Sequence, residues 1–470
     1  MTVTPAISET ATPAADRPAH RDPDVLRWLG AYASSAIGDN VYYVALSWAA
    51  VRSGTPSQAG LVMAASAVPR ALLMLGGGVI ADRFGPRRVL LTGSGVRCAA
   101  VLTVAVLLLV SSPGLWLLGV LALVFGVVDA VLMPALGALP ARITARGQLA
   151  RVQGMRGMAS RLAGVLGAPL GGLGVAFGGA AAAFGAAALL FAVSLPLLAA
   201  VRIGRQPHEG RPAGELPAGK EGRAGPEGSG TRELPAGLGA PGGSEQVAAP
   251  ETSAGPEEAV APQGSGRPSA ARDVRDGLEY ILRNPVLARL MVVIALSDLG
   301  FVGPLNVGLT LLADERGWGA SGMGWVLAGF GAGAGAMSLL LTVRGRVPRA
   351  GLVLSVTIAV GAVAVGAIAY VPTLAAAVGV ALAVGLLAGL SGALCGALMQ
   401  TESDPAFVGR VTSVANLFSL GLAPLTFPLT GAAITLWGTG PVFAASAGVC
   451  ALGGLTGLGS GALRRAELPR

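Results

Sequence analysis

The stretch LWLLGVLALVFGVVDAVLMPALGAL, residues 115–139, decides the fold class of this chain. Asp129 is its only charged residue. The stretch is long enough for a helix to cross the hydrocarbon core of a bilayer, which takes about 20 apolar residues. Inside lipid the backbone must satisfy its own hydrogen bonds, and a single helix does so within the segment. The stretch therefore predicts a transmembrane helix.

The composition of the whole chain also indicates a membrane protein. Charged residues make up 12% and hydrophobic residues 53% of its 470 residues, and the mean hydropathy is +0.67. Soluble domains carry about 25% charged residues, so this chain has too little polar surface to solvate a soluble fold of its length. We predict an all-α membrane protein with the lipid bilayer as its partner.

Cutting the sequence at charges and turn residues predicts twelve such helices in two groups of six. The expected spans are 26–51, 57–81, 89–110, 115–139, 152–177 and 180–201, then 286–312, 322–343, 352–370, 373–399, 407–436 and 442–463. The expected domains are a disordered tail (1–25), a six-helix bundle (26–201), a disordered linker rich in Gly, Pro, Glu and Ala (202–272), a second six-helix bundle with an interfacial helix before it (273–463) and a short tail (464–470). In the interfacial helix, Val274, Leu278, Ile281 and Leu282 are expected to share one apolar face.

Arginine placement predicts the orientation. Arginines gather in alternate connections, including Arg87, Arg142, Arg346 and Arg410, whereas the opposite connections carry only Arg52 and Arg316. Short cytoplasmic loops are enriched in basic residues. We therefore expect a multi-pass protein of the inner (plasma) membrane with both termini and the linker in the cytoplasm.

Several classes of function are disfavoured by what the sequence lacks. The net charge of +8 is not arranged as a basic stripe with interleaved aromatics, so we expect no nucleic-acid partner. Lys220 is the only lysine, which leaves no Walker motif. The two histidines lie in polar segments and the three cysteines lie singly in apolar runs, so we expect no metal and no cofactor. No nucleophile or metal motif of an enzyme is present.

Five ionisable residues are expected near the middle of the membrane, where charges are costly and mark function. They are the proton-coupling or substrate candidates Asp39, Asp129, Asp298, Arg70 and Arg161. Counting about 1.5 Å per residue from the span ends suggests the pairs Asp39 with Arg70 and Asp129 with Arg161, and places Arg97 and Arg156 at shallower depth. Burial favours a protonated carboxyl and a nearby arginine favours the ionised form, so a carboxylate whose partner moves can carry protons. Asp39 is the leading candidate, and a static salt bridge is an equal alternative for Asp129.

The connection between the second and third spans carries a recognisable motif. Residues 78–88 read GVIADRFGPRR. The motif resembles the cytoplasmic signature of the major facilitator superfamily, G-x-x-x-D-R-x-G-R-[RK], although Pro86 stands where that family has a basic residue. The matching positions are Gly78, Asp82, Arg83, Gly85 and Arg87, with Arg88 beside them. The resemblance implies the major facilitator fold, two pseudo-symmetric six-helix bundles that alternate between two open states, with this motif as a gate; the alternative is a basic turn without a gating role.

The fifth span resembles a glycine-rich motif of drug antiporters in that superfamily. The matching residues are Gly154, Gly167, Pro169, Gly171 and Gly172, whereas Ala163 replaces one glycine and the proline is shifted by one position. A bent, glycine-rich helix supplies a groove and a close packing face. General small-residue packing explains the same pattern equally well.

A third set of residues is similar to the tenth-to-eleventh span junction of the drug:proton antiporter 3 branch: Gln400, Gly409 and Arg410. The resemblance implies a secondary transporter that exports small hydrophobic or amphiphilic compounds in exchange for protons, and we expect it to act as a monomer. Import of a small metabolite and a non-transporting membrane scaffold or receptor are the alternatives.

Overall fold

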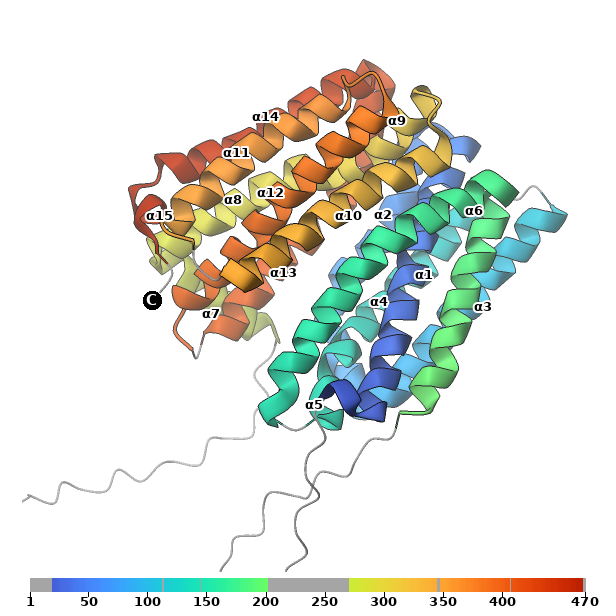
Figure 1. The fold of residues 1–470 in the computed structure, drawn as a ribbon, viewed down its shortest axis with the longest axis horizontal. Coiled ribbons are helices and arrows are strands. Elements are labelled where there is room, and N and C mark those ends of the chain that lie inside the picture. Colours follow the sequence, from blue (N-terminus) through green and yellow to red (C-terminus); the bar gives the residue numbers. More distant parts are fainter. Residues whose placement is uncertain are drawn as a thin grey trace, which may run out of the picture. The chain divides into compact units, whose positions relative to one another are not determined.

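The computed structural model describes residues 19–111, 114–144, 146–201, 270–344, 347–405 and 407–467, and in these parts every regular element is a helix (Figure 1). Residues 1–18 of the predicted amino-terminal tail lie outside the described residues, as do residues 202–269 of the predicted linker and residues 468–470. Residues 19–25 of that tail are helical instead: a 3-10 turn (Ala19–Arg21) precedes a helix that starts at Pro23. Each half of the described chain contributes six long helical segments, as the fold prediction requires.

The first half holds five long helices, of which one is bent. They are α1 (Pro23–Ser53), α2 (Pro56–Phe84), α3 (Pro86–Val110), α4 (Leu115–Ala138) and α6 (Leu149–Ala199), with the short α5 (Pro140–Ile143) between the last two. The bend in α6 falls at Gly178 and Gly179, where Gly179 has φ of 69°. Glycine adopts this left-handed conformation without a Cβ clash, so α6 is two antiparallel arms that correspond to the fifth and sixth predicted spans.

The second half begins with the amphipathic helix α7 (Ala270–Arg283). The long segments that follow are α8 (Pro285–Gly303), continued by a π-helical turn (Pro304–Gly308) and α9 (Leu309–Glu315), then α10 (Gly319–Arg344), α11 (Ala350–Ile368), α12 (Leu374–Thr401), α13 (Val408–Trp437) and α14 (Thr439–Gly459), with the short α15 (Gly461–Arg465) at the end. The π-turn inside the seventh span was not predicted. Such turns often lie at functional sites in membrane and soluble helices.

Helix starts follow the local sequence. Asp22, Asn284 and Thr373 each accept a hydrogen bond from backbone N–H groups in the first turn of α1, α8 and α12. Side-chain acceptors at this position satisfy donors that a helix leaves free at its start. These three helices start within a few residues of the predicted spans.

By length and composition, nine of the described helices are able to cross a membrane, and α6 counts once among them. The two arms of α6 taken separately, together with the long helices α1 and α2, which are not among those nine, correspond to the twelve expected segments. Large apolar side chains remain exposed along these helices, for example Val110 at 74% and Phe177 at 88%. Exposed apolar surface of this extent fits lipid rather than water.

The amphipathic helix α7 packs against α8 and α13 through a face that differs from the predicted one. Ile281 is buried and Gly277 lies against Arg410, whereas Leu278 and Leu282 are exposed. Val274 has no described side chain. Of the predicted apolar face, Ile281 is therefore buried against the protein, whereas Leu278 and Leu282 stay exposed on the surface of the helix.

The two halves meet at the end of the bundles where α1 finishes and α2 begins. A Cβ on Gly60 of α2 would lie 2.5 Å from the carbonyl oxygen of Phe427 in α13, so the helix backbones touch there. The Ser57 and Thr435 hydroxyls lie 3.0 Å apart in the same crossing. Small residues permit such close approach in membranes, and this contact joins the first half to the second.

Candidate functional site

Three helices of the first half bring together a buried cluster of charges. Arg97 of α3 forms ion pairs with Asp39 of α1 and with Asp129 of α4, and its Nη1 lies 3.6 Å from Asp129 Oδ1. Arg97 is 3% exposed and Asp129 is 6% exposed. Charges at this depth require partners because the hydrocarbon cannot solvate them. Arg97 supplies the partner for both carboxylates.

Aromatic rings hold Arg97 in place. The guanidinium carbon lies 4.3 Å from the ring centre of Phe125 and 4.5 Å from that of Phe191. Tyr42 stacks on Phe125 with ring centres 3.8 Å apart. Cation–π contacts of desolvated groups contribute about 2 kcal/mol each. The arginine is therefore fixed by both charge and packing.

A second arginine extends the cluster toward the middle of the protein. Arg70 Nη1 of α2 lies 3.8 Å from Asp129 Oδ2 and donates a hydrogen bond of 3.1 Å to the Tyr43 hydroxyl. Asp39, Arg97, Asp129, Arg70 and Tyr43 thus form one continuous chain of polar contacts, which we call the charge network.

The charge network corrects the two pairings predicted from helical depth. Asp39 pairs with Arg97 rather than with Arg70, and Asp129 pairs with Arg97 and Arg70 rather than with Arg161. Arg161 Nη1 instead donates to the carbonyl oxygen of Ala334 in α10, at 3.2 Å.

Arg97 was missed for an identifiable reason. The third span was expected to start at residue 89, whereas α3 begins at Pro86, so Arg97 lies near the middle of the helix and not in its outer part. A proline one residue after a glycine is a helix-start signal, and Gly85 followed by Pro86 could have placed the helix start correctly.

A pocket of about 280 Å³ lies between the halves and borders the charge network. Phe330 of α10 is among its apolar lining residues. Its polar lining residues are Asn40, Tyr43 and Ser47 of α1, Ser160 and Arg161 of α6, and Asn306 of the π-turn. Tyr43 belongs to both the pocket and the charge network. The pocket therefore combines apolar walls with a few polar groups, as small-molecule sites do.

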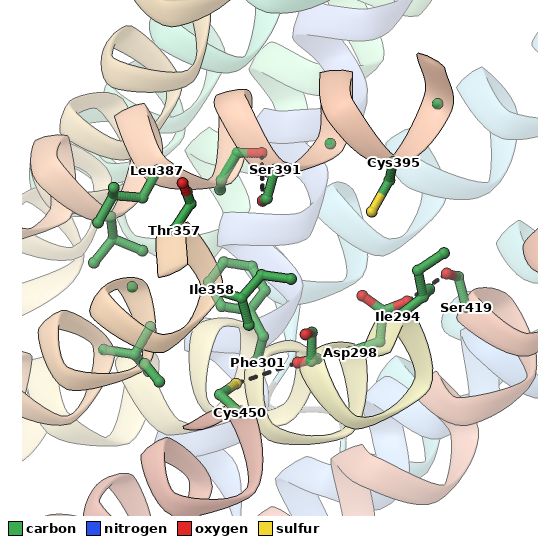
Figure 2. A pocket seen from close by; sticks show the side chains of 18 of the residues that line it. Ile294, Asp298, Phe301, Thr357, Ile358, Leu387, Ser391, Cys395, Ser419 and Cys450 are labelled. Carbon is green, nitrogen blue, oxygen red and sulfur yellow. Dashed lines mark hydrogen bonds between the residues drawn. The ribbon is translucent and has the colours of Figure 1, made fainter. Parts of the chain in front are cut away.

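Asp298 lies apart from the charge network, on α8 in the second half. Its Oδ2 accepts a hydrogen bond from the Ser419 hydroxyl of α13. The carboxylate borders a second cavity, formed within the second half (Figure 2). The five candidates thus separate into three places: the charge network, the pocket between the halves and this cavity.

The motif at residues 78–88 spans the end of α2 and the start of α3, but the surroundings of Gly78 and the side chain of Asp82 are outside the described part of the chain. Gly85 adopts φ of 83° in the turn before α3. Arg87 donates to the carbonyl oxygen of Ala199 at the end of α6. A cation is stabilised at the carboxyl end of a helix, so Arg87 ties α3 to α6, whereas Arg83 and Arg88 are exposed.

The glycine-rich segment of α6 packs on two helices. A Cβ on Gly167 or Gly171 would meet Asn40 and Val41 of α1, and one on Gly172 would meet the Ala320 carbonyl of α10 in the other half. Gly154 faces open space and Pro169 lies inside the helix, beside the Gly324 contact. The segment therefore forms a packing face both within its half and between the halves.

The junction between α12 and α13 lies beside α7. The ring centres of Tyr280 in α7 and Phe407 are 4.5 Å apart, and the Arg410 guanidinium lies over Phe407 at 5.2 Å. Gln400 and Gly409 are exposed.

Paired bundles of long apolar helices, with a pocket at their interface and buried charges next to it, define a polytopic α-helical transporter. The sequence profile of the Major Facilitator Superfamily matches residues 28–428. The chain belongs to this superfamily, and it is therefore a secondary transporter of the membrane and not an enzyme.

Solved structures agree with this fold. A structure of the nucleoside transporter NupG superimposes with a TM-score of 0.63 at 11% identity, covering 93% of this chain and 98% of that one. A mutant of NupG gives 0.63 at 10% identity, with 93% and 99% covered. A bacterial homolog of the human lysosomal transporter Spinster, in an inward-facing and unoccupied conformation, gives 0.55 at 15% identity, with 94% and 95% covered. A comparison with curated proteins gives no match. At these identities the likeness concerns the fold alone.

Proposed function

We propose that the protein exports small hydrophobic or amphiphilic compounds in exchange for protons. The observation that carries the proposal is Tyr43, which lines the pocket between the halves and joins it to a buried carboxylate network. A change in the shape of the pocket can therefore move Tyr43 and alter the contacts of the ionisable groups in the charge network. The resemblance of the α6 motif and of the junction near Arg410 to drug antiporters supports export as the direction.

Asp39 is the proton-carrying group in this proposal. Its side chain is 32% exposed, whereas that of Asp129 is 9% exposed, so Asp39 is the carboxylate that water reaches. While Arg97 stays in contact, the ionised form of Asp39 is favoured. When α1 and α3 separate during rocking, the carboxylate loses the arginine that favours its ionised form and takes up a proton from the water that reaches it. Asp129 keeps Arg70 as a second partner and anchors the network.

The substrate lies in the pocket between the halves in this mechanism. Phe330 and the surrounding aliphatic side chains favour an apolar body, and Asn40, Asn306 and Arg161 offer hydrogen bonds to a polar end. A volume of about 280 Å³ suits a molecule of modest size in the present conformation.

The described conformation is inward-facing in this proposal. With the orientation that the arginine distribution predicts, the contact of Gly60 with Phe427 would lie on the outer side of the plasma membrane. Arg52 of α1 and Asp314 of α9 close the same side with an ion pair of 3.3 Å. The motif that ends in Arg87 and Arg88 then lies on the cytoplasmic side, where it closes in the opposite state, and both termini lie in the cytoplasm.

Efflux is tested first in cells. An efflux-deficient bacterial host expressing the protein is challenged with a panel of toxic amphiphiles, with and without a protonophore. Protection that the protonophore removes supports the proposal. Increased sensitivity to a compound identifies import, and unchanged sensitivity to every compound favours a protein that does not transport them.

The proton site is tested with Asp39→Asn in proteoliposomes that contain a pH-sensitive dye and a compound found by the panel. The variant is expected to lose substrate-driven proton flux by at least about tenfold, because the amide cannot carry a proton. Asp24→Asn, in the first turn of the same helix, where Asp24 pairs with Arg27 and not with the charge network, is the matched control and keeps the flux. Proton flux at the normal rate in Asp39→Asn, with equal amounts inserted, would remove Asp39 from the mechanism.

A further inference from the structure

The second half contains a cavity of its own, which the transport mechanism above does not use. Its volume is about 350 Å³, and its walls come from α8, α11, α12, α13 and α14. Figure 2 shows Asp298 and Ser419 on one side of the cavity, with Cys395 of α12 facing them. This volume lies in the range of small-molecule sites, about 300–1,000 Å³.

One carboxyl group lines the cavity. Asp298 is the only charged side chain among the described residues that line it. Among the described residues, its one side-chain hydrogen bond comes from the neutral Ser419 hydroxyl. In the charge network each carboxylate has an arginine beside it, so Asp298 differs from Asp39 and Asp129 in lacking a cation among the described residues. A carboxylate inside a membrane protein is stabilised by a positive charge.

A further polar group beside the carboxylate has its hydrogen-bonding capacity free. The Ser297 hydroxyl oxygen is buried without a hydrogen-bond partner among the described residues. Ser297 borders the same cavity as Asp298 and Asn416. Buried polar groups without a partner are rare in native proteins and call for an explanation. The oxygen itself has almost no accessible surface and lies against Gly453 of α14, 3.1 Å from where a Cβ on that glycine would be, so the cation site below does not include it.

The rest of the wall is apolar and separates the cavity from the pocket between the halves. Phe301 lines the cavity, Phe330 lines the pocket, and their ring centres are 5.7 Å apart. This aromatic pair stands between the two spaces. No residue of the first half lines the cavity among the described residues, so a molecule inside it is held by the second half alone.

We propose that this cavity binds a small monovalent organic cation with an apolar body, such as an aryl or alkyl ammonium compound. Asp298 neutralises the cation, the Phe301 ring offers a cation–π face, and the aliphatic walls hold the apolar part. The inference goes beyond the proposed function, because it depends neither on proton coupling nor on the direction of transport.

The cation site is tested with purified full-length protein in nanodiscs and radiolabelled benzyltrimethylammonium as the probe. Equilibrium dialysis is expected to show saturable binding of one cation per chain. Asp298→Asn is expected to weaken binding by about tenfold or more, since a charge-assisted contact is lost. Asp298→Glu keeps the charge and retains measurable binding, and Glu279→Gln, which removes an exposed carboxylate from α7 of the same half, leaves it unchanged.

Cys395 locates the bound probe. In a chain that carries Cys98→Ser and Cys450→Ser, Cys395 is the only thiol. The cation is expected to slow its labelling by N-ethylmaleimide in the parent chain and not in Asp298→Asn. The neutral isostere neopentylbenzene should compete at least about tenfold more weakly than the cation if charge decides binding.

Three results would overturn the cation site: no saturable binding of benzyltrimethylammonium, equal binding by Asp298→Asn, or equal competition by the neutral isostere. The last result would mean that the carboxyl is protonated and that the cavity is selective for apolar shape only. All three measurements are made without a proton gradient, so they are independent of whether Asp39→Asn affects transport.

Discussion

Mutagenesis can decide whether Asp129 pairs with Arg97, as in the structure, or with Arg161, as its depth along the helix suggested. Depth suggested Asp129 with Arg161, whereas the structure has Arg97 Nη1 at 3.6 Å from Asp129 and Arg161 on the Ala334 carbonyl. Two double-mutant cycles compare these alternatives. One combines Arg97→Met with Asp129→Asn, and the other combines Arg161→Met with Asp129→Asn.

The magnitude follows from burial and distance. At 3.6 Å, two unit charges attract by about 4–5 kcal/mol with an effective dielectric constant of 20. Removing one member of a buried ion pair costs about 3–5 kcal/mol, because the other charge stays without a partner. Arg97→Met also loses its contacts with Phe125 and Phe191. Asp129 still has Arg70, so we expect a coupling free energy of about 1–3 kcal/mol between Arg97 and Asp129.

The Arg161 cycle is the control. The Arg161 side chain is exposed in the pocket and bonds to a backbone carbonyl, so its coupling to Asp129 should stay below about 0.5 kcal/mol. The measurement is the free energy of unfolding in mixed micelles, from titration with a denaturing detergent. Equal couplings in the two cycles, or a larger one for Arg161, would refute the charge network.

Two further predictions concern the closed end of the halves. Gly60→Leu places a side chain where a Cβ would already lie 2.5 Å from the Phe427 carbonyl oxygen, so it should force α2 and α13 apart and reduce transport. A cysteine introduced at Ser57 should then be labelled several-fold faster. Unchanged labelling would contradict the close approach of the two helices. Arg52→Gln removes the ion pair with Asp314. The two side chains are 64% and 35% exposed, so the free energy of unfolding should change by less than about 1 kcal/mol. A loss above about 2 kcal/mol in the same unfolding titration would show that this pair is stronger than a surface ion pair.

Part of the candidate site could be read from the sequence, because charges are costly in lipid wherever they fall. That argument selected Asp39, Asp129, Asp298, Arg70 and Arg161, and three of these five, namely Asp39, Asp129 and Arg70, lie in the charge network. It passed over Arg97, since an error of three residues in the start of α3 moved it away from the membrane centre.

The π-turn and the cavity could not be predicted in the same way. A π-turn depends on how one turn of helix packs between its neighbours, as Gly303 does against Thr430 and Gly308 against Phe443. The cavity near Asp298 is the space that five helices leave unfilled. Neither property is encoded in a local pattern of the chain.

The sequence by itself determined the helices, since a bilayer requires apolar stretches of fixed length whose backbone bonds are satisfied within each helix. The hydropathy along a helix indicates how deep each residue lies in the membrane. It indicates little about how the helix is rotated about its axis, because lipid and a neighbouring helix are equally apolar. The partners of Asp39 and Asp129 depend on that rotation and on the side of each bundle that faces the other half. Only the tertiary structure decided them, through the packing of Phe125 and Phe191 around Arg97 and the close approach of backbones at Gly60.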